Sequence, residues 1–288
     1  TSRPPEIGSL FFAWITAVLE LCVLLPFFLR SITSKARIRV DPRLWDKHGP
    51  VSHPILRLAV AGVIFAFCAY YLIVGLSMVD SVTGILAIKT QPISMMIIGA
   101  VILKERLTLK EILIGILMLF LIMFITTKGT FQLAEITTGV LILLIVPIFW
   151  NIGHTLAKPF LEHKALSVIE FVFIRIAITS FILTILFAFM GDWGDLRFLT
   201  NAPALISILS MTVIFTLAHN TWYQTVKRLP LSVASMIVIP SPALTALLAY
   251  FITHDPLFYY HYIGIVGEIV GLYALILIQR RKGNNQKK

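Results

Sequence analysis

Charged side chains are scarce in this sequence. They make up 13% of its 288 residues, against roughly 25% in a soluble domain. A chain with so few charges cannot cover a water-facing surface, which excludes an ordinary soluble domain. Apolar residues make up 58% and the mean hydropathy is +0.91, which excludes a disordered chain. Two cysteines are too few for a disulfide scaffold or a cysteine-rich metal site. A polytopic helical membrane protein remains.

Recognisable catalytic motifs are also missing. The sequence contains no P-loop, no G-x-S-x-G and no H-E-x-x-H, and none of its acidic, histidine and cysteine residues have metal-ligand spacing. We therefore expect neither an enzyme nor an ATP-driven pump, and no cofactor or metal. The net charge of +10 would suggest nucleic acid only on a soluble fold with a basic face, so no nucleic-acid partner is expected.

Long apolar runs predict the transmembrane helices. Backbone polar groups cannot stay unpaired in lipid, so each crossing must be a helix of about 20 residues. The expected spans are 7–29, 55–77, 81–103, 109–127, 136–157, 167–190, 203–224, 231–252 and 260–279. The fold class is therefore an all-α polytopic membrane protein with nine visible transmembrane helices and short connections, apart from a long one at 30–54.

Lysine and arginine gather in alternate connections. Most of them lie in the long connection at 30–54, in the connections two, four and six further along, and after residue 279. The opposite side carries only Arg3, Lys128 and Arg197. The positive-inside rule then puts the C-terminus in the cytoplasm and residue 1 outside. We expect an integral membrane protein of the plasma membrane.

Two stretches of the chain, 81–125 and 231–275, are similar to each other. At an offset of 150 residues the matches are Pro92 with Pro242, Glu105 with Asp255, Leu107 with Leu257 and, after a one-residue slip, Gly115 with Gly264. The turn of the first copy lies on the basic side, and the turn of the second lies on the opposite side. This predicts inverted repeats, which are typical of secondary transporters with a site near the midplane. The alternative is that two proline-containing membrane helices look alike by chance.

This run of span, proline, acidic turn and glycine-opened span, repeated twice, resembles the EamA branch of the drug/metabolite transporter superfamily. The resemblance implies ten helices in two inverted five-helix repeats, here 1–128 and 129–288. Four helices are visible in the first half, so its first helix is expected to be missing. The family glutamate is present as Glu105 and is replaced by Asp255 in the second turn. The resemblance also implies secondary transport, commonly the export of metabolites or amino acids.

Charged residues inside the spans are the first candidates for a site. Lys89 lies three residues before Pro92. Proline has no N–H group, so it leaves a backbone carbonyl of the preceding turn unpaired. A basic side chain beside such a helix break could bind an anion. Alternatively, Lys89 pairs with Glu20 or Glu268 as a structural ion pair. Arg175 either faces a cavity or forms such a pair. Glu20 and Glu268 carry a coupling proton or serve as counter-charges.

Polar stripes on two other spans complete the candidate set. Asn151 and His154 share one helix face, as do His219 and Tyr223, and stripes of this kind should face the interior because lipid disfavours them. Interhelical hydrogen bonding is the alternative role for each residue. The predicted substrate-binding residues are Lys89, Arg175, Tyr70, Tyr71, Asn151, His154, His219, Trp222 and Tyr223, with Pro92, Pro240 and Pro242 as helix breaks for gating.

These observations predict a secondary transporter of a small polar or anionic metabolite, such as an amino acid or organic acid, working by alternating access as an exporter. A cationic drug or multidrug exporter of the same superfamily is one alternative, and a non-transporting membrane scaffold is another. A membrane enzyme would need a convergent catalytic set, which the sequence lacks. The expected partners are a small-molecule substrate and the lipid bilayer, with a homodimer left open.

Overall fold

A computed structural model of the chain shows how the predicted helices pack. It describes residues 7–33, 54–79, 84, 87–88, 90–102, 107–127, 129–131, 137–162, 165–240, 251 and 257–285. Within these ranges all regular structure is helical. Lys89 and Pro242 lie outside the described residues, and so do Glu105 and Asp255.

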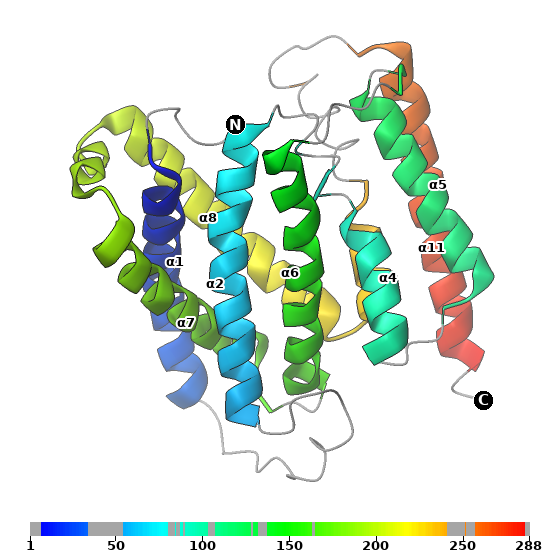
Figure 1. Cartoon of the computed structure of the whole chain (residues 1–288). Helices are drawn as coiled ribbons and strands as arrows, with labels where there is room; N and C mark the ends of the chain where they lie inside the picture. The colour runs from blue at the N-terminus through cyan, green and yellow to red at the C-terminus, as the bar shows by residue number, and fades with distance from the viewer. Residues whose placement is uncertain are drawn as a thin grey trace.

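Nine α-helices and one 3-10 helix make up the described part. They are α1 (Ser9–Thr33), α2 (Pro54–Met78), α4 (Gln91–Ile102), α5 (Leu109–Thr126), α6 (Thr138–Glu162), α7 (Val168–Met190), η2 (Trp193–Leu199), α8 (Ala202–Val226), α9 (Leu231–Ile237) and α11 (Tyr259–Asn285). Figure 1 shows that α1 begins at one end of the bundle and that α11 finishes at the other.

Six of these helices are long and apolar enough to cross a membrane, namely α1, α2, α6, α7, α8 and α11. They match six of the nine predicted spans. The other three predicted spans contain α4, α5 and α9, of which α5 covers almost its whole predicted range. The short connection after α7 forms η2, whose first turn is capped by Asp192.

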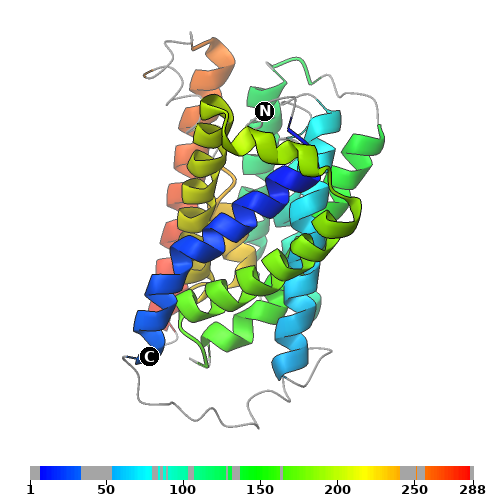
Figure 2. The ribbon, with the colours of Figure 1, turned by 90° about the vertical axis from the view of Figure 1, so that its left-hand side faces the viewer.

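Helix pairs build the bundle. The most extensive contacts join α2 to α6 and α1 to α7, followed equally by α5 to α11 and α2 to α7. Figure 1 shows α5 and α11 side by side at one edge, with α4 between them and the α2–α6 pair. Figure 2 shows α1 and α7 running obliquely across the other helices. Contacts of α1 with α2, α7 and α8 then enclose the region that holds the candidate site.

Capping boxes mark the start of two helices. Ser167 accepts a hydrogen bond from the Glu170 backbone, and the Glu170 carboxylate accepts one from the Ser167 backbone. Thr108 and Glu111 form the same arrangement before α5. Each box satisfies amide groups that the first helical turn leaves unpaired. Glu170 also accepts a hydrogen bond of 2.8 Å from Ser31 on α1, which ties α1 to α7 at this end.

Two glycines allow close approach around α2. A Cβ atom at Gly62 would lie 2.5 Å from the Cγ2 atom of Ile178 on α7, and one at Gly153 on α6 would lie 2.9 Å from the Cζ atom of Phe65. No side chain fits at either distance without a shift of its neighbours. These glycines therefore let α2 pack tightly between α6 and α7, and they set the position of the Phe65 ring.

Candidate substrate-binding cavity

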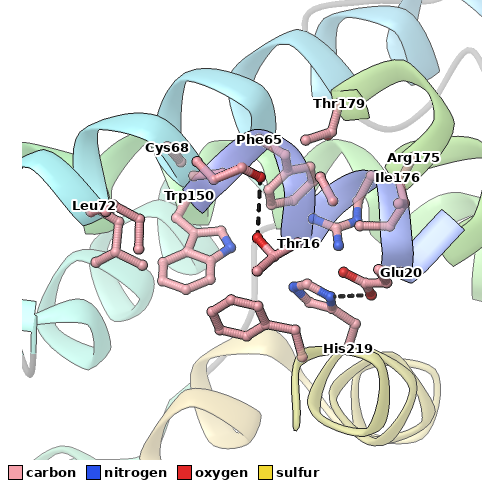
Figure 3. Close-up of a pocket in the computed structure, with 15 residues that line it drawn as sticks. Thr16, Glu20, Phe65, Cys68, Leu72, Trp150, Arg175, Ile176, Thr179 and His219 are labelled. Atoms are coloured by element: carbon pink, nitrogen blue, oxygen red, sulfur yellow. Dashed lines mark hydrogen bonds and ion pairs between the residues drawn. The ribbon is translucent and has the colours of Figure 1, made fainter. Parts of the chain in front are cut away.

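A cavity lies where α1, α2, α6, α7 and α8 meet. Its volume is about 80 Å³, whereas a cavity that holds one buried water needs roughly 10–15 Å³. The cavity therefore has room for several waters or a small metabolite. Its lining residues are Ala13, Thr16, Ala17, Glu20, Phe65, Cys68, Ala69, Leu72, Ile73, Trp150, Arg175, Ile176, Thr179, Phe215 and His219. Figure 3 shows the side chains of Glu20, Arg175 and His219 pointing toward one shared space.

Arg175 lies in the wall of this cavity and is 3% exposed. It is seven residues into α7, or about 10 Å along the helix at 1.5 Å per residue, so it lies well inside the membrane-spanning segment. Its guanidinium makes no hydrogen bond or ion pair with any described residue, and Nε and one terminal nitrogen are fully buried without a partner. Of the two alternatives for Arg175, the cavity is therefore the one observed within the described structure.

Aromatic rings surround the Arg175 guanidinium. Its Cζ atom lies 4.6 Å from the centroid of the Phe65 ring and 5.7 Å from that of Tyr223. Cation–π attraction of this kind stabilises a charge by about 0.5–2 kcal/mol. The guanidinium N–H groups remain without hydrogen-bond acceptors, because an aromatic ring face attracts positive charge but does not accept directed hydrogen bonds as a carboxylate does. The guanidinium is thus held in place while its donors stay available.

Glu20 and His219 form a pair across the same cavity. Nδ1 of His219 on α8 lies 2.7 Å from Oε1 of Glu20 on α1. The Glu20 side chain is 3% exposed and that of His219 is 20% exposed. Since an ionised carboxylate only accepts hydrogen bonds, Nδ1–H of His219 is the donor. The partner of Glu20 in the described structure is therefore His219.

His154, Trp222 and Tyr223 form a second buried cluster. The indole N–H of Trp222 donates to Nδ1 of His154 over 3.1 Å, and the Tyr223 hydroxyl lies 3.2 Å from the same nitrogen. Indole nitrogen is a donor only, so Nδ1 of His154 must be an acceptor, and the imidazole is neutral with its proton on Nε2. These three residues, predicted to bind substrate, pack behind Phe65 and Arg175 and do not appear among the lining residues.

Asn151 joins α6 to the start of α4. Its amide nitrogen donates to the Gln91 carbonyl over 2.9 Å and to the Ser94 hydroxyl over 2.7 Å, and its amide oxygen accepts from the Gln91 side chain. Pro92 lies between these two partners, although its side chain is outside the described part. Asn151 is fully buried, as its place in a polar stripe predicted. In this conformation its side-chain amide forms hydrogen bonds between α6 and α4.

The remaining candidates lie away from the cavity lining. Tyr71 is 44% exposed beside the apolar groove between α2 and α6, and the Tyr70 ring packs against it. Glu268 is buried on α11, which packs on α5. Pro240 lies in the turn that follows α9.

Three aromatic residues of the lining were not predicted from the sequence: Phe65, Trp150 and Phe215. Phe65 lies in a continuous apolar run, where nothing in the pattern separates a ring that faces a cavity from one that faces lipid. Trp150 directly precedes Asn151, and Phe215 lies four residues before His219, so the two polar stripes were the signal that could have indicated these rings. Thr16 was missed as well, and its hydroxyl bonds back to the Phe12 carbonyl over 2.7 Å. Among the described residues no group of three or more His, Cys, Asp or Glu side chains could hold a metal ion.

Comparison with known sequences identifies the family. The profile of the EamA-like transporter family matches residues 3–127 and again residues 137–277. The chain belongs to the EamA-like transporter family. It is therefore a membrane transporter. The two matches fall within the two predicted halves of the chain, one in each.

Individual relatives agree with this assignment. The chain is 26% identical over 229 residues to the uncharacterized transporter YyaM of Bacillus subtilis (strain 168), which covers 75% of this chain and 70% of the relative. It is also similar to a solved structure described only as the crystal structure of a protein, with a TM-score of 0.70, 12% identity, and coverage of 96% of this chain and 90% of that one. The second likeness concerns the fold alone.

Proposed function

We propose that this protein is a secondary transporter of a small anionic or zwitterionic metabolite, such as an organic acid or amino acid, and that Arg175 binds the substrate carboxylate. One observation carries the proposal: a buried guanidinium lines a cavity inside the membrane-spanning bundle and has no hydrogen-bond or ion-pair partner in the described structure. A charge placed at the bilayer centre costs about 3 kcal/mol on insertion scales. A ligand that supplies the missing partner offsets that cost.

The chemistry of the guanidinium selects the ligand. Its donors form a planar fork that fits the two oxygens of a carboxylate, and such charge-assisted pairs are among the strongest hydrogen bonds in proteins. The volume of the cavity suits a metabolite of few heavy atoms. The rings of Phe65, Trp150 and Phe215 would contact its apolar part. Lys89, a predicted span residue, is proposed as a second basic contact.

The proposed mechanism is alternating access. Helices α1 and α2 of the first predicted half and α6, α7 and α8 of the second all contribute to the cavity, as expected for a site between two halves that rock against each other. In this proposal the breaks at Pro92, Pro240 and Pro242 provide the points where helices bend. Each half-cycle opens the cavity to one side and separates residues that now close it.

Orientation and direction are part of the same proposal. The distribution of lysine and arginine supports a cytoplasmic C-terminus in the plasma membrane, and we propose export as the physiological direction, with a homodimer as the assembly to be tested. Inside-out vesicles that accumulate substrate, while right-side-out vesicles lose it, would support export. Net accumulation in right-side-out vesicles alone would contradict it.

A cationic-drug exporter is the second candidate. Glu20 supplies a buried carboxylate in the same cavity as three aromatic rings, and such a combination attracts organic cations. Its hydrogen bond to His219 and the nearby charge of Arg175 argue against it. The two candidates predict opposite ligand preferences and opposite roles for Arg175.

A thermal-stability screen of the purified protein tests the proposal. Wild type, Arg175→Gln and Lys89→Gln are compared with anionic, zwitterionic and cationic metabolites, and Arg197→Gln in exposed η2 is the matched control. A ligand at 100 times its Kd stabilises the folded state by about 2.7 kcal/mol. Stabilisation by carboxylates that disappears in Arg175→Gln and persists in Arg197→Gln supports the proposal. Stabilisation by cations alone supports the drug exporter, and no stabilisation by any class supports a scaffold.

A further inference from the structure

We propose that the Glu20–His219 pair takes up one proton whenever an anion binds at Arg175, so that the two cross the membrane together. The inference rests on the proposed function, and it names the coupling ion and the atoms that carry it. It starts from the geometry of the cavity, in which a buried carboxylate–imidazole pair and an unpartnered guanidinium share one small space.

The count of charges in the cavity is the first step. Arg175 contributes one positive charge, Glu20 one negative charge, and a neutral His219 none, so the empty cavity is neutral. No other charged residue is among those that line it in the described structure. A bound carboxylate adds one negative charge, which is expensive in a site shielded from water. Uptake of one proton by the pair restores neutrality.

The geometry shows where that proton goes. Nδ1–H of His219 already donates to Oε1 of Glu20 over 2.7 Å. Figure 3 shows the other ring nitrogen turned toward the open space of the cavity, and it has no hydrogen-bond partner among the described residues. The incoming proton therefore binds Nε2. The product is an imidazolium that keeps its bond to the Glu20 carboxylate, beside a carboxylate ligand held by Arg175.

His154 is the other histidine near Arg175, and its contacts prevent the same role. Its Nδ1 accepts the indole N–H of Trp222, so its proton already occupies Nε2. A second proton would have to bind Nδ1, where it would face the Trp222 donor head-on and break that hydrogen bond. The two histidines thus differ by the partner of Nδ1: a carboxylate for His219 and a donor for His154.

Four other groups, each on a different helix, act electrostatically on this region. They are Cys68 on α2, His154 on α6, Arg175 on α7 and Tyr223 on α8. A thiol and a phenol are neutral acids at neutral pH, so they can lose a proton but do not gain one. Arg175 is already protonated. None of these four groups is therefore placed to take up the proton, which leaves the Glu20–His219 pair.

Coupling of this kind has a thermodynamic consequence. If anion binding takes up a proton, protonation must strengthen anion binding by the same factor. Anion affinity then rises as pH falls, by up to about tenfold per pH unit when one full proton is coupled. Transport is electroneutral, so an acidic metabolite that accumulates in the cell leaves with a proton, driven by its own gradient and independent of the membrane potential.

Isothermal titration calorimetry of the purified full chain tests the inference, with benzoate as the probe and propionate as a smaller second probe. Titrations at pH 7 in two buffers of different ionisation enthalpy give the number of protons taken up per bound anion. For wild type we expect close to one proton taken up per bound benzoate, and we expect the affinity for benzoate to fall as the pH rises from 6 to 8. His261→Gln, at the start of α11 and outside the cavity lining, is the matched control and should behave as wild type.

Two variants, one of each member of the pair, test the proposal independently. His219→Gln keeps a donor for Glu20 but cannot take up a proton, so it should bind benzoate without proton uptake and without pH dependence. Glu20→Gln makes the empty cavity positive, so it should also bind without proton uptake, and at pH 8 at least as tightly as wild type. If one of them does not fold, the other still decides.

The outcomes separate the two proposals. Benzoate binding that depends on Arg175 but involves no proton in wild type, or the same proton uptake in His219→Gln, overturns the coupling while the carboxylate site stands. Failure of both benzoate and propionate to bind wild type overturns the site and the coupling together.

Discussion

Arg175 of α7 and Phe65 of α2 form a cation–π contact, with 4.6 Å between the guanidinium carbon and the ring centroid. This contact fixes the arginine without neutralising it. A carboxylate in the same place would satisfy the guanidinium and leave nothing for a substrate. The ring is itself positioned by the absence of a side chain at Gly153, so a packing feature of α6 determines where the charge lies.

Replacing the ring tests this relationship. Phe65→Leu keeps an apolar side chain but removes the π face, so we expect a loss of about 0.5–2 kcal/mol and weaker, less ordered anion binding. Phe67→Leu, two residues along α2, 46% exposed and outside the cavity lining, is the control and should change little. Denaturation in detergent and benzoate titration measure both effects. Equal effects of the two substitutions would contradict the assigned role of Phe65.

The Trp222–His154 hydrogen bond provides a second prediction. Trp222→Phe removes the donor to Nδ1 of His154 and leaves a buried acceptor with only the Tyr223 hydroxyl nearby. We expect a loss of about 1–3 kcal/mol and, because Nδ1 is then free to bind a proton, an additional proton-uptake site in calorimetry. Trp193→Phe on η2, where the indole is 56% exposed, should show neither change. Proton uptake that is identical in Trp222→Phe and wild type would argue against the assigned tautomer.

The sequence singled out Arg175, Glu20 and His219, which all line the cavity, whereas most of the apolar lining could not be predicted. A single arginine inside a long apolar span is easily recognised, because a charge there is costly and indicates a cavity or a charged partner. Helix α2 is apolar on every side, so its sequence does not say which of Phe65, Phe67 and Tyr71 faces inward. The packing of α2 against α6 and α7 decides that, and it places Tyr71 beside the groove between α2 and α6 instead of in the cavity.

Close packing at Gly62 gives a third prediction. Alanine normally stabilises a helix relative to glycine by about 0.5–1 kcal/mol. At Gly62, however, the new Cβ would lie 2.5 Å from Ile178, and overpacking typically costs about 1–3 kcal/mol. We therefore expect Gly62→Ala to lower stability and to widen the α2–α7 contact beside the cavity. The double variant with Ile178→Ala should recover part of the loss in thermal denaturation. Additive losses would show that the two residues do not touch.

The link between α1 and α7 gives a fourth prediction. Ser167→Ala removes the N-cap of α7 and its contact with Ser31, so we expect a loss of about 1 kcal/mol. The control is Ser207→Ala, because that hydroxyl bonds only to the Pro203 carbonyl of its own helix. Urea denaturation of both variants in detergent measures the difference. A larger effect at Ser207 than at Ser167 would contradict the capping assignment.

The polar stripe predicted that Asn151 is buried, but not which residues it contacts. Its spacing from His154 predicted burial, and both residues are buried. The partners of Asn151, Gln91 and Ser94, lie about 60 positions away on α4, and no local pattern pairs them with it. The sequence therefore indicated that these groups face the interior, but the choice between lining a cavity and joining two helices depends on the tertiary arrangement. The same holds for Glu20, whose partner on α8 is 199 positions distant.

The most direct test of the account is benzoate counterflow in proteoliposomes. Vesicles loaded with unlabelled benzoate take up labelled benzoate only if the protein exchanges it across the membrane. Wild type and Arg197→Gln should exchange at similar rates. Arg175→Gln should fall by about tenfold or more, because a charge-assisted hydrogen-bonding pair contributes about 1.5–3 kcal/mol, and Arg175→Lys should fall between them. Exchange by Arg175→Gln at the wild-type rate would contradict the assignment of Arg175 as the carboxylate-binding residue.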